Sequence, residues 1–305
     1  MDKIEKNLLK EIASLHDIPE GAFSLRKNGE GVARNSTEHI IITPKEEKSG
    51  IDIRVIKGTK NESLHIPVIL TKTGLKEMVY NDFFIEDDCD VTIIAGCGIH
   101  NSGCDTSEHD GIHTFHIGKN SVVRYVEKHY GQGKGNGEKV MNPTTVVYLD
   151  EGSKMEMETT QIGGVDSTDR LTKAVVGKDA SIVVKEKLLT EGKQSAKTDF
   201  VVDLDGENSS ANIVSRSVAK GDSYQKFISR INGNNLCSGH TECDAIIMDN
   251  GTVVAVPEVA ANNINASLIH EAAIGKIAGE QLIKLMTLGL SEQEAEEQIV
   301  TGFLK

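Results

Sequence analysis

The sequence lacks tryptophan, has few aromatic residues (4%) and contains no long unbroken apolar run. A membrane-spanning helix needs about 18 or more consecutive apolar residues, and the polar first residues lack the apolar core of a secretory signal, so we expect a cytoplasmic protein. Positive charge is also scarce, since 33 Lys and Arg face 46 Asp and Glu, a net charge of −13 with no basic stripe. Because this charge repels nucleic acids and anionic membranes, neither is expected as a partner.

Cysteine is sparse as well. Five cysteines are too few, and odd in number, for the disulfide framework of a secreted protein, and in a reducing compartment they remain thiols. These thiols are therefore available for metal or sulfur chemistry. They are Cys89, Cys97, Cys104, Cys237 and Cys243.

Glycine is abundant, with 29 residues scattered among short runs rich in Val, Ile and Thr, as expected of many short strands. One phrase recurs between about residues 51 and 256: an apolar residue, two or three polar turn residues, a small residue, then alternating apolar and polar residues. Copies begin at Ile85, Ile117, Leu149, Val176, Leu204 and Met248. The first five begin 32, 32, 27 and 28 residues apart, which predicts a β-solenoid. A β-sandwich is the alternative, because it too is built from short, regularly spaced strands.

Both ends of the chain have helical periodicity. Residues 1–16 place an apolar stripe on a charged segment, formed by Ile4, Leu8, Ile12 and Leu15, which predicts a short amphipathic helix. Near the other end the same periodicity predicts a helix over about 272–288.

A second C-terminal helix follows. Gly289 stands where a helix ends, and Ser291 with Glu294 forms a capping-box pair that opens the next helix. The resulting helical hairpin either caps the solenoid or docks a partner. We therefore divide the chain into an N-terminal helical and extended segment (1–48), a β-helix core (49–268) and a C-terminal helical segment (269–305).

The densest group of potential ligands lies in residues 237–244. Its members are Cys237, His240, Glu242, Cys243 and Asp244. Thiolates suit iron–sulfur clusters and zinc, and a carboxylate or imidazole can complete a labile site. Two buried cysteines in a turn are the structural alternative, and within a strand Glu242 and Cys243 would face opposite sides. One chain supplies only two thiols here, which a symmetric homodimer would double.

A second group resembles another metal site. It contains Cys97, Cys104, His109, His113 and His116. The spacing matches no zinc ribbon, and the intervening glycines also suit tight corners, so both interpretations stand.

A glycine-rich stretch at 131–137 lacks the Gly-Lys-Ser/Thr end of a P-loop and is expected to be a loop. Nucleotide hydrolysis must therefore come from another chain. The pair His270-Glu271, taken alone, is explained by ordinary electrostatics at a helix start.

Several motifs resemble the SufB/SufD family of iron–sulfur assembly scaffolds. They are Thr-Glu-Cys-Asp-Ala at 241–245, His-Glu-Ala-Ala-Ile-Gly-Lys-Ile at 270–277, Leu-Gly-Leu-Ser-Glu-Gln-Glu-Ala at 288–295 and Ile-Val-Thr-Gly-Phe at 299–303. The match is specific over about 205–305. The middle of the chain is similar to the family's right-handed parallel β-helix, and the N-terminal part is similar to short members of minimal systems.

The resemblance implies a scaffold rather than an enzyme, on which iron and sulfide form a transient cluster, [4Fe–4S] being expected. It also implies that the C-terminal helices bind an ABC-type ATPase, SufC or its counterpart, so this chain binds no nucleotide.

By the same resemblance Cys243 matches the cysteine of the family's Cys-Asp pair, and His270 and Glu271 match its His-Glu pair. Proximity adds Cys237, His240 and Glu242, and we expect Cys237, Glu242 and Cys243 to be the metal ligands. We expect a homodimer through the C-terminal part of the β-helix, with its two-fold axis beside this loop.

The chain also departs from the larger members of the family. No cysteine lies between Cys104 and Cys237, so their internal sulfur relay cannot be transferred, and free sulfide entering at Cys97 or Cys104 is an alternative source. Two other functions are alternatives: a β-helix enzyme acting on polysaccharide, which the cytoplasmic signature disfavours, and a zinc-dependent hydrolase using the three histidines between 109 and 116.

Overall fold

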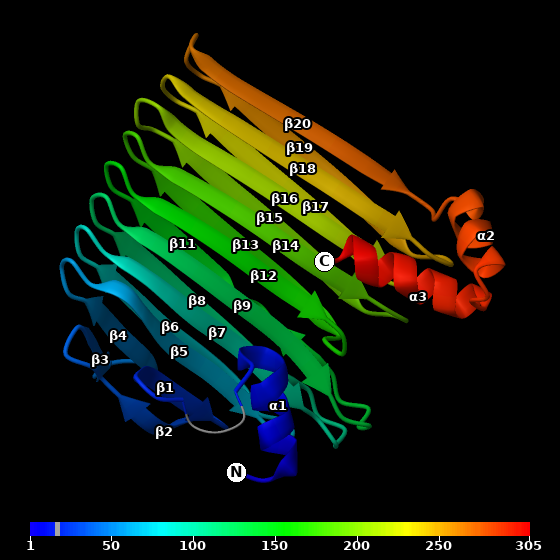
Figure 1. Ribbon diagram of the computed structural model, residues 1–305. Helices are drawn as coiled ribbons and strands as arrows, with labels where there is room; N and C mark the ends of the chain where they lie inside the picture. The colour runs from blue at the N-terminus through cyan, green and yellow to red at the C-terminus, as the bar shows by residue number, and fades with distance from the viewer. Residues whose placement is uncertain (16–18) are drawn as a thin grey trace.

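Two ten-stranded sheets face each other along the molecule in the computed structural model, which describes residues 1–15 and 19–305 (Figure 1). The chain passes from one sheet to the other through a turn after nearly every strand, so each coil stacks on the preceding one. Apart from the antiparallel β1–β2 and β3–β4 pairs, the paired strands run parallel. The predicted parallel β-helix is confirmed.

We call the sheets A and B. Sheet A contains, in spatial order, β2 (Glu30–Asn35), β1 (Ala22–Lys27), β5 (Lys60–Leu70), β7 (Asp90–His100), β9 (Val122–Gln132), β12 (Lys154–Ile162), β14 (Ser181–Thr190), β16 (Ser209–Ala219), β18 (Cys237–Ile247) and β20 (Ala266–Gly275). Sheet B contains β19 (Thr252–Ala261), β17 (Tyr224–Gly233), β15 (Ser195–Leu204), β13 (Ser167–Val176), β10 (Lys139–Met141) with β11 (Thr144–Leu149), β8 (Ser107–Ile117), β6 (Lys76–Ile85), β4 (Gly50–Val55) and β3 (Ile40–Pro44).

The recurring sequence phrase forms the corners of the solenoid. Its first five copies turn the chain from sheet B to sheet A, whereas the copy at Met248 lies at the opposite edge, between β18 and β19. The small residue of the phrase is buried at the corner, and the Cys89 backbone N–H donates to Ser121 Oγ of the next coil at 2.9 Å. The burial of Cys89 is therefore accounted for by its position at a corner of the solenoid.

The interior of the solenoid follows the alternation of the strands. Side chains at every second position point inward, and one buried cluster extends from Ala22 to Cys243. Aromatic rings stack from coil to coil, as in Phe83 on Phe115, whose centroids lie 4.2 Å apart. The apolar residues of the repeat are thus buried continuously along the axis of the solenoid.

The predicted N-terminal amphipathic helix is present as α1 (Lys3–Ala13), and it covers the outer face of sheet A. Leu8 and Ile12 are fully buried, whereas Ile4 remains 39% exposed. The helix approaches β7 so closely that a Cβ on Gly96 would lie 2.5 Å from the Ile12 carbonyl oxygen, so only glycine fits there. His16, the last residue of the predicted helical stretch, lies outside the described residues.

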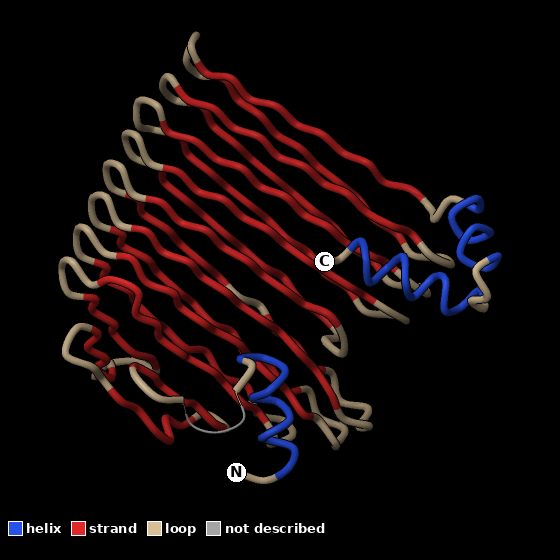
Figure 2. The backbone as a smooth tube through the Cα atoms, viewed as in Figure 1, coloured by secondary structure: helices blue, strands red, loops and turns tan. Residues whose placement is uncertain are grey.

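The C-terminal helices lie at one corner of the solenoid, distant from α1 (Figure 2). They are α2 (Gly279–Thr287) and α3 (Glu292–Phe303), the latter opened by the predicted Ser291–Glu294 capping box. The predicted start near residue 272 is wrong, because β20 pairs with β18 as far as Gly275 and the ladder holds these residues extended. None of the helices within the described residues is long and apolar enough to span a membrane.

The limits of the three proposed segments remain a prediction. The boundary at 269 falls inside β20, and β1 pairs with β5, so strands from the N-terminal segment continue the sheet of the core.

Candidate functional site

Strand β18 separates the predicted ligands onto its two faces. Cys237 and Cys243 are 5% and 1% exposed and point into the solenoid, as does the fully buried Thr241. His240 and Glu242 alternate with them and point outward. The opposite orientation of Glu242 and Cys243 follows directly from the two-residue period of a strand.

The structure therefore does not bring the expected metal ligands Cys237, Glu242 and Cys243 together within one chain. The two thiols are six residue steps apart along the strand, which corresponds to about 20 Å at the usual rise per residue. Glu242 lies on the other face. Across residues 1–15 and 19–305, no group of three or more His, Cys, Asp or Glu side chains is placed to hold a metal ion.

The His270-Glu271 pair lies on the neighbouring strand β20 rather than at a helix start. His270 stands beside Thr241 and Glu271 beside Glu242, so the histidine points inward and the glutamate outward. The offset of one strand and two residues puts the α-carbons of His270 and Cys243 about 8 Å apart. His270 Nδ1 is buried without a hydrogen-bond partner, and burial lowers the pKa of this imidazole.

Cys243 lies in a polar part of the solenoid interior. Its neighbour on β16 is Ser215, which donates a hydrogen bond to Glu186 Oε2 at 2.7 Å. Burial, followed by the charges of Glu186 and Asp244, raises the pKa of the Cys243 thiol to about 12. The thiol is therefore protonated at neutral pH, and it becomes a ligand only when a metal displaces the proton.

The outer face of the same strands carries a mainly acidic group. His240 Nε2 lies 3.8 Å from Glu271 Oε2, and Glu242 is followed by Asp244 on the same face. A hydrogen bond with Asp244, together with burial, raises the pKa of Glu242. These residues can attract cations to the surface next to the strand but not into the interior.

The C-terminal end of the solenoid is open. Among the described residues, β19 and β20 each have a paired strand on one side only. Their exposed apolar side chains include Val259 (49%) and Ile269 (52%). Cys243 is one strand away from this edge.

The second predicted group is also divided between two faces. Cys97, His109 and His113 point inward, whereas His116 lies on the outer surface, stacked between Phe84 and Tyr148. Cys104 lies in an exposed turn. The three histidines of the zinc-hydrolase alternative therefore do not converge, which removes its ligand set.

The inward members of this group surround a small internal cavity of about 20 Å³. Gly111 makes room for the imidazoles, since a Cβ there would lie 3.3 Å from His113 Nε2 and 3.6 Å from His109 Nε2. His113 Nδ1 hydrogen-bonds with the Tyr125 hydroxyl at 2.8 Å. Burial lowers the pKa of His113 to about 4.

Sequence reasoning missed a buried ion cluster beside this cavity. Glu127 accepts hydrogen bonds from Tyr125, at 3.0 Å, and from Arg170. Arg170 Nη2 also lies 3.3 Å from His129 Nδ1. Despite burial, the Arg170 guanidinium holds the pKa of Glu127 well below its usual value. The sequence did contain a signal for this cluster. Alternate residues of β9 point inward, and Glu127 and His129 continue the alternation that begins with Val123 and Tyr125.

The glycine-rich stretch behaves as predicted. It begins in β9 and continues as a loop to β10, with no helix after it. The close approach of two loops requires glycine at 135, where a Cβ would lie 2.2 Å from the Gly103 carbonyl oxygen.

Comparison with known proteins identifies the family of this chain. The family model described as SUF system FeS cluster assembly, SufBD core domain, matches residues 74–303. An iron-sulfur cluster assembly SufBD family protein of Methanocaldococcus jannaschii is 31% identical over 275 residues, 88% of this chain and 85% of that protein. Another, from Archaeoglobus fulgidus, is 32% identical over 267 residues, 85% of this chain and 69% of that protein. The iron-sulfur cluster assembly protein SufB of Bacillus subtilis is 39% identical over 102 residues, 32% of this chain and 22% of that protein. The chain belongs to the SufBD family of iron–sulfur cluster assembly proteins.

Proposed function

We propose that this chain is the scaffold of a Suf-type assembly complex, on which iron and sulfide form a transient cluster beside Cys243. The chain acts as a scaffold rather than an enzyme, and an ABC-type ATPase of the SufC kind supplies ATP hydrolysis. The observation that carries this proposal is the position of Cys243, a family-matching cysteine one strand away from the open end, with His270 on the last strand. The form proposed for the cluster is [4Fe–4S].

A single chain does not supply enough ligands for this cluster. Cluster irons are usually held by four protein ligands, and imidazoles can replace some of the thiolates. Two copies of the chain would bring two Cys243 thiolates and two His270 imidazoles, a set of four. This set replaces the one containing Cys237 and Glu242, and its mixed character suits a cluster that must be released.

The proposed homodimer uses the open C-terminal end. The edges of β19 and β20 present unpaired backbone groups and exposed apolar side chains, which favour pairing with another chain. A two-fold axis at this end would make the interface isologous and place the two copies of the site on either side of it.

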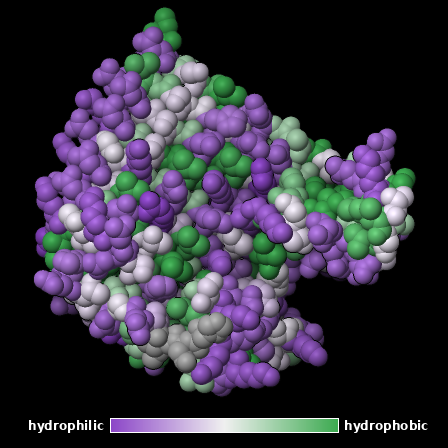
Figure 3. Space-filling view, viewed as in Figure 1, coloured by the Kyte–Doolittle hydropathy of each residue, from purple (hydrophilic) through white to green (hydrophobic). Residues whose placement is uncertain are grey.

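The proposed ATPase contact uses α2. No residue of this helix is buried. Ile283 and Met286 are 62% and 43% exposed, and Leu288, the residue that caps the helix, is 80% exposed. Figure 3 shows apolar side chains gathered on the helices that project from the solenoid. By contrast, Leu304, at the end of α3, packs with Val218 and Met248, which anchors the pair to the β-helix.

Anaerobic reconstitution with ferrous iron and sulfide tests the assembly site. We expect wild type to bind iron and acid-labile sulfide with a cluster spectrum, visible by absorption and Mössbauer spectroscopy. Cys243→Ser should lose most of the cluster because serine is a poor ligand for iron in such a site.

Cys97→Ser is the matched control, since Cys97 is also a buried, inward-pointing thiol on sheet A. It should load like wild type. Equal loading of all three proteins would refute the assignment of Cys243, and protein that is purified with bound zinc and no labile sulfide would refute the cluster function itself.

A further inference from the structure

Cys243 belongs to a row of inward-pointing polar side chains on three successive strands of sheet A. Glu186 on β14 stands beside Ser215 on β16, and Ser215 stands beside Cys243 on β18. Neighbouring strands are about 4.8 Å apart, so the serine hydroxyl lies between the carboxylate and the thiol. The row therefore connects the proposed cluster site with a carboxylate deeper in the solenoid.

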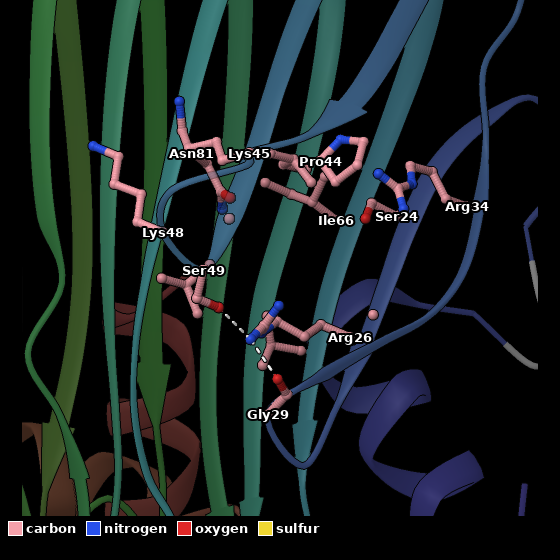
Figure 4. Close-up of a pocket in the computed structure, with 15 residues that line it drawn as sticks. Ser24, Arg26, Gly29, Arg34, Pro44, Lys45, Lys48, Ser49, Ile66 and Asn81 are labelled. Atoms are coloured by element: carbon pink, nitrogen blue, oxygen red, sulfur yellow. Dashed lines mark hydrogen bonds between the residues drawn. The ribbon is translucent and has the colours of Figure 1, made fainter.

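Glu186 is a buried carboxylate that lacks a cationic partner. It is 5% exposed, and it forms no ion pair within the part of the chain that the structure describes. By contrast, the inward-pointing Glu127 is paired with Arg170. Glu77, another inward glutamate, is paired with Arg26, which Figure 4 shows at the N-terminal end of the solenoid. A buried charge without a partner is costly, so the position of Glu186 needs an explanation beyond stability.

Hydroxyl groups surround the Glu186 carboxylate instead. Thr198 Oγ1 donates to Oε1 at 2.9 Å, and Ser215 Oγ donates to Oε2 at 2.7 Å. Thr159, the neighbour of Glu186 on β12, lines the same internal cavity of about 10 Å³, and its buried hydroxyl has no hydrogen-bond partner. This hydroxyl can accept a hydrogen bond from the protonated acid. The surroundings therefore suit both the carboxylate and the carboxylic acid.

The Cys243 thiol has to lose its proton before it can bind iron. Because it is 1% exposed, bulk water does not reach it to carry the proton away. Ser215 donates its only hydroxyl proton to Glu186, so its oxygen is free to accept the proton of the thiol. Contacts of this kind often tighten only when the metal or substrate is bound. His270 lies on the other neighbouring strand, but as a proposed iron ligand it must keep its lone pair.

We propose that Glu186 accepts the Cys243 proton through Ser215 when iron binds, an inference that rests on the proposed function. The S–H bond of Cys243 breaks and a sulfur–iron bond forms. The thiol proton passes to Ser215 Oγ while the proton of the serine hydroxyl passes to Glu186 Oε2. The negative charge of Glu186 is in effect moved to the sulfur, where the iron balances it.

Stopped-flow binding of Cd²⁺ to the purified full chain tests this relay without requiring a cluster. The cadmium–thiolate charge-transfer band reports on the thiols, and the phase that is missing from Cys243→Ser belongs to Cys243. Glu186→Gln and Ser215→Ala should each slow this phase at least about tenfold, the lower range for losing a positioned proton acceptor. Ser215→Thr keeps the hydroxyl and should restore the wild-type rate, which a purely structural role of Ser215 does not predict.

Ser217→Ala is the matched control. Ser217 is also buried and inward on β16, but its neighbour on β18 is Ala245 rather than a thiol, so this variant should bind Cd²⁺ at the wild-type rate. Circular dichroism checks that all variants are folded. A wild-type rate in Ser215→Ala or Glu186→Gln, an equal slowing in Ser217→Ala, or no Cys243 phase in wild type overturns the proposal. If the relay variants behave as expected but no cluster forms on reconstitution, only the proposed function fails.

Discussion

At the scale of single residues, the interior of this β-helix is more polar than its repeat implies. Glu127 and Arg170 are 3% and 4% exposed, although an unpaired buried charge is costly. Each compensates the other across 43 residues of sequence. The alternation around Glu127 predicts that this side chain points inward. Its partner could not be predicted from the sequence, because the pairing depends on the register between coils.

His113 gives this polar interior a pH dependence. Its pKa is lowered to about 4 because burial penalises the charged ring. Between pH 6.5 and 4 the unfolded chain binds a proton at this position that the folded chain does not, so stability falls as the pH falls. The loss is about 3 kcal/mol in total across that interval.

His113→Gln should therefore flatten the decline in urea-unfolding free energy between pH 6.5 and 4. His39→Gln, at a half-exposed position, is the control and should keep the wild-type decline. The same slope in His113→Gln and wild type would show that other groups cause the acid destabilisation.

At the scale of elements, the sequence correctly predicts the helices and strands whose pattern is local. The stripe of α1 and the capping box of α3 are both present, and the repeated corner phrase identified where strands begin and end. The helix predicted over residues 272–275 does not form, because its periodicity competes with backbone pairing to β18, whose residues lie almost 30 positions earlier in the sequence. The same strand assignment divided the predicted ligands between two faces.

Helix α2 is the element whose role is most easily tested. Because none of its residues is buried, Ile283→Asp should leave the thermal midpoint unchanged while abolishing binding to a purified SufC-type ATPase, measured by calorimetry. Ile162→Asp introduces the same charge at a similarly exposed apolar position on β12 and should bind normally. Retained binding by Ile283→Asp would place the ATPase contact elsewhere.

At the scale of the whole molecule, the two ends of the solenoid are built differently. The N-terminal end finishes in two antiparallel hairpins, β1–β2 and β3–β4, whereas at the C-terminal end β19 and β20 are the last strands of their sheets and pair in parallel with β17 and β18. Solenoids need covered ends to stay soluble, and an uncovered edge favours association. Under the proposed function, the position of Cys243 near this edge would link association to cluster binding.

Sedimentation equilibrium tests this link. Wild type should behave as a dimer of the 33.0 kDa chain, and Val259→Lys/Ile269→Lys should behave as a monomer because two charges oppose two others across the axis. Val32→Lys/Ile41→Lys, at comparable exposure (49% and 39%) on the edge strands of the other end, should remain dimeric. A monomeric wild type would refute the homodimer. A dimeric Val259→Lys/Ile269→Lys variant would show that the dimer interface lies elsewhere. If the monomeric variant also fails to hold a cluster while its fold is intact, the ligands must come from both chains.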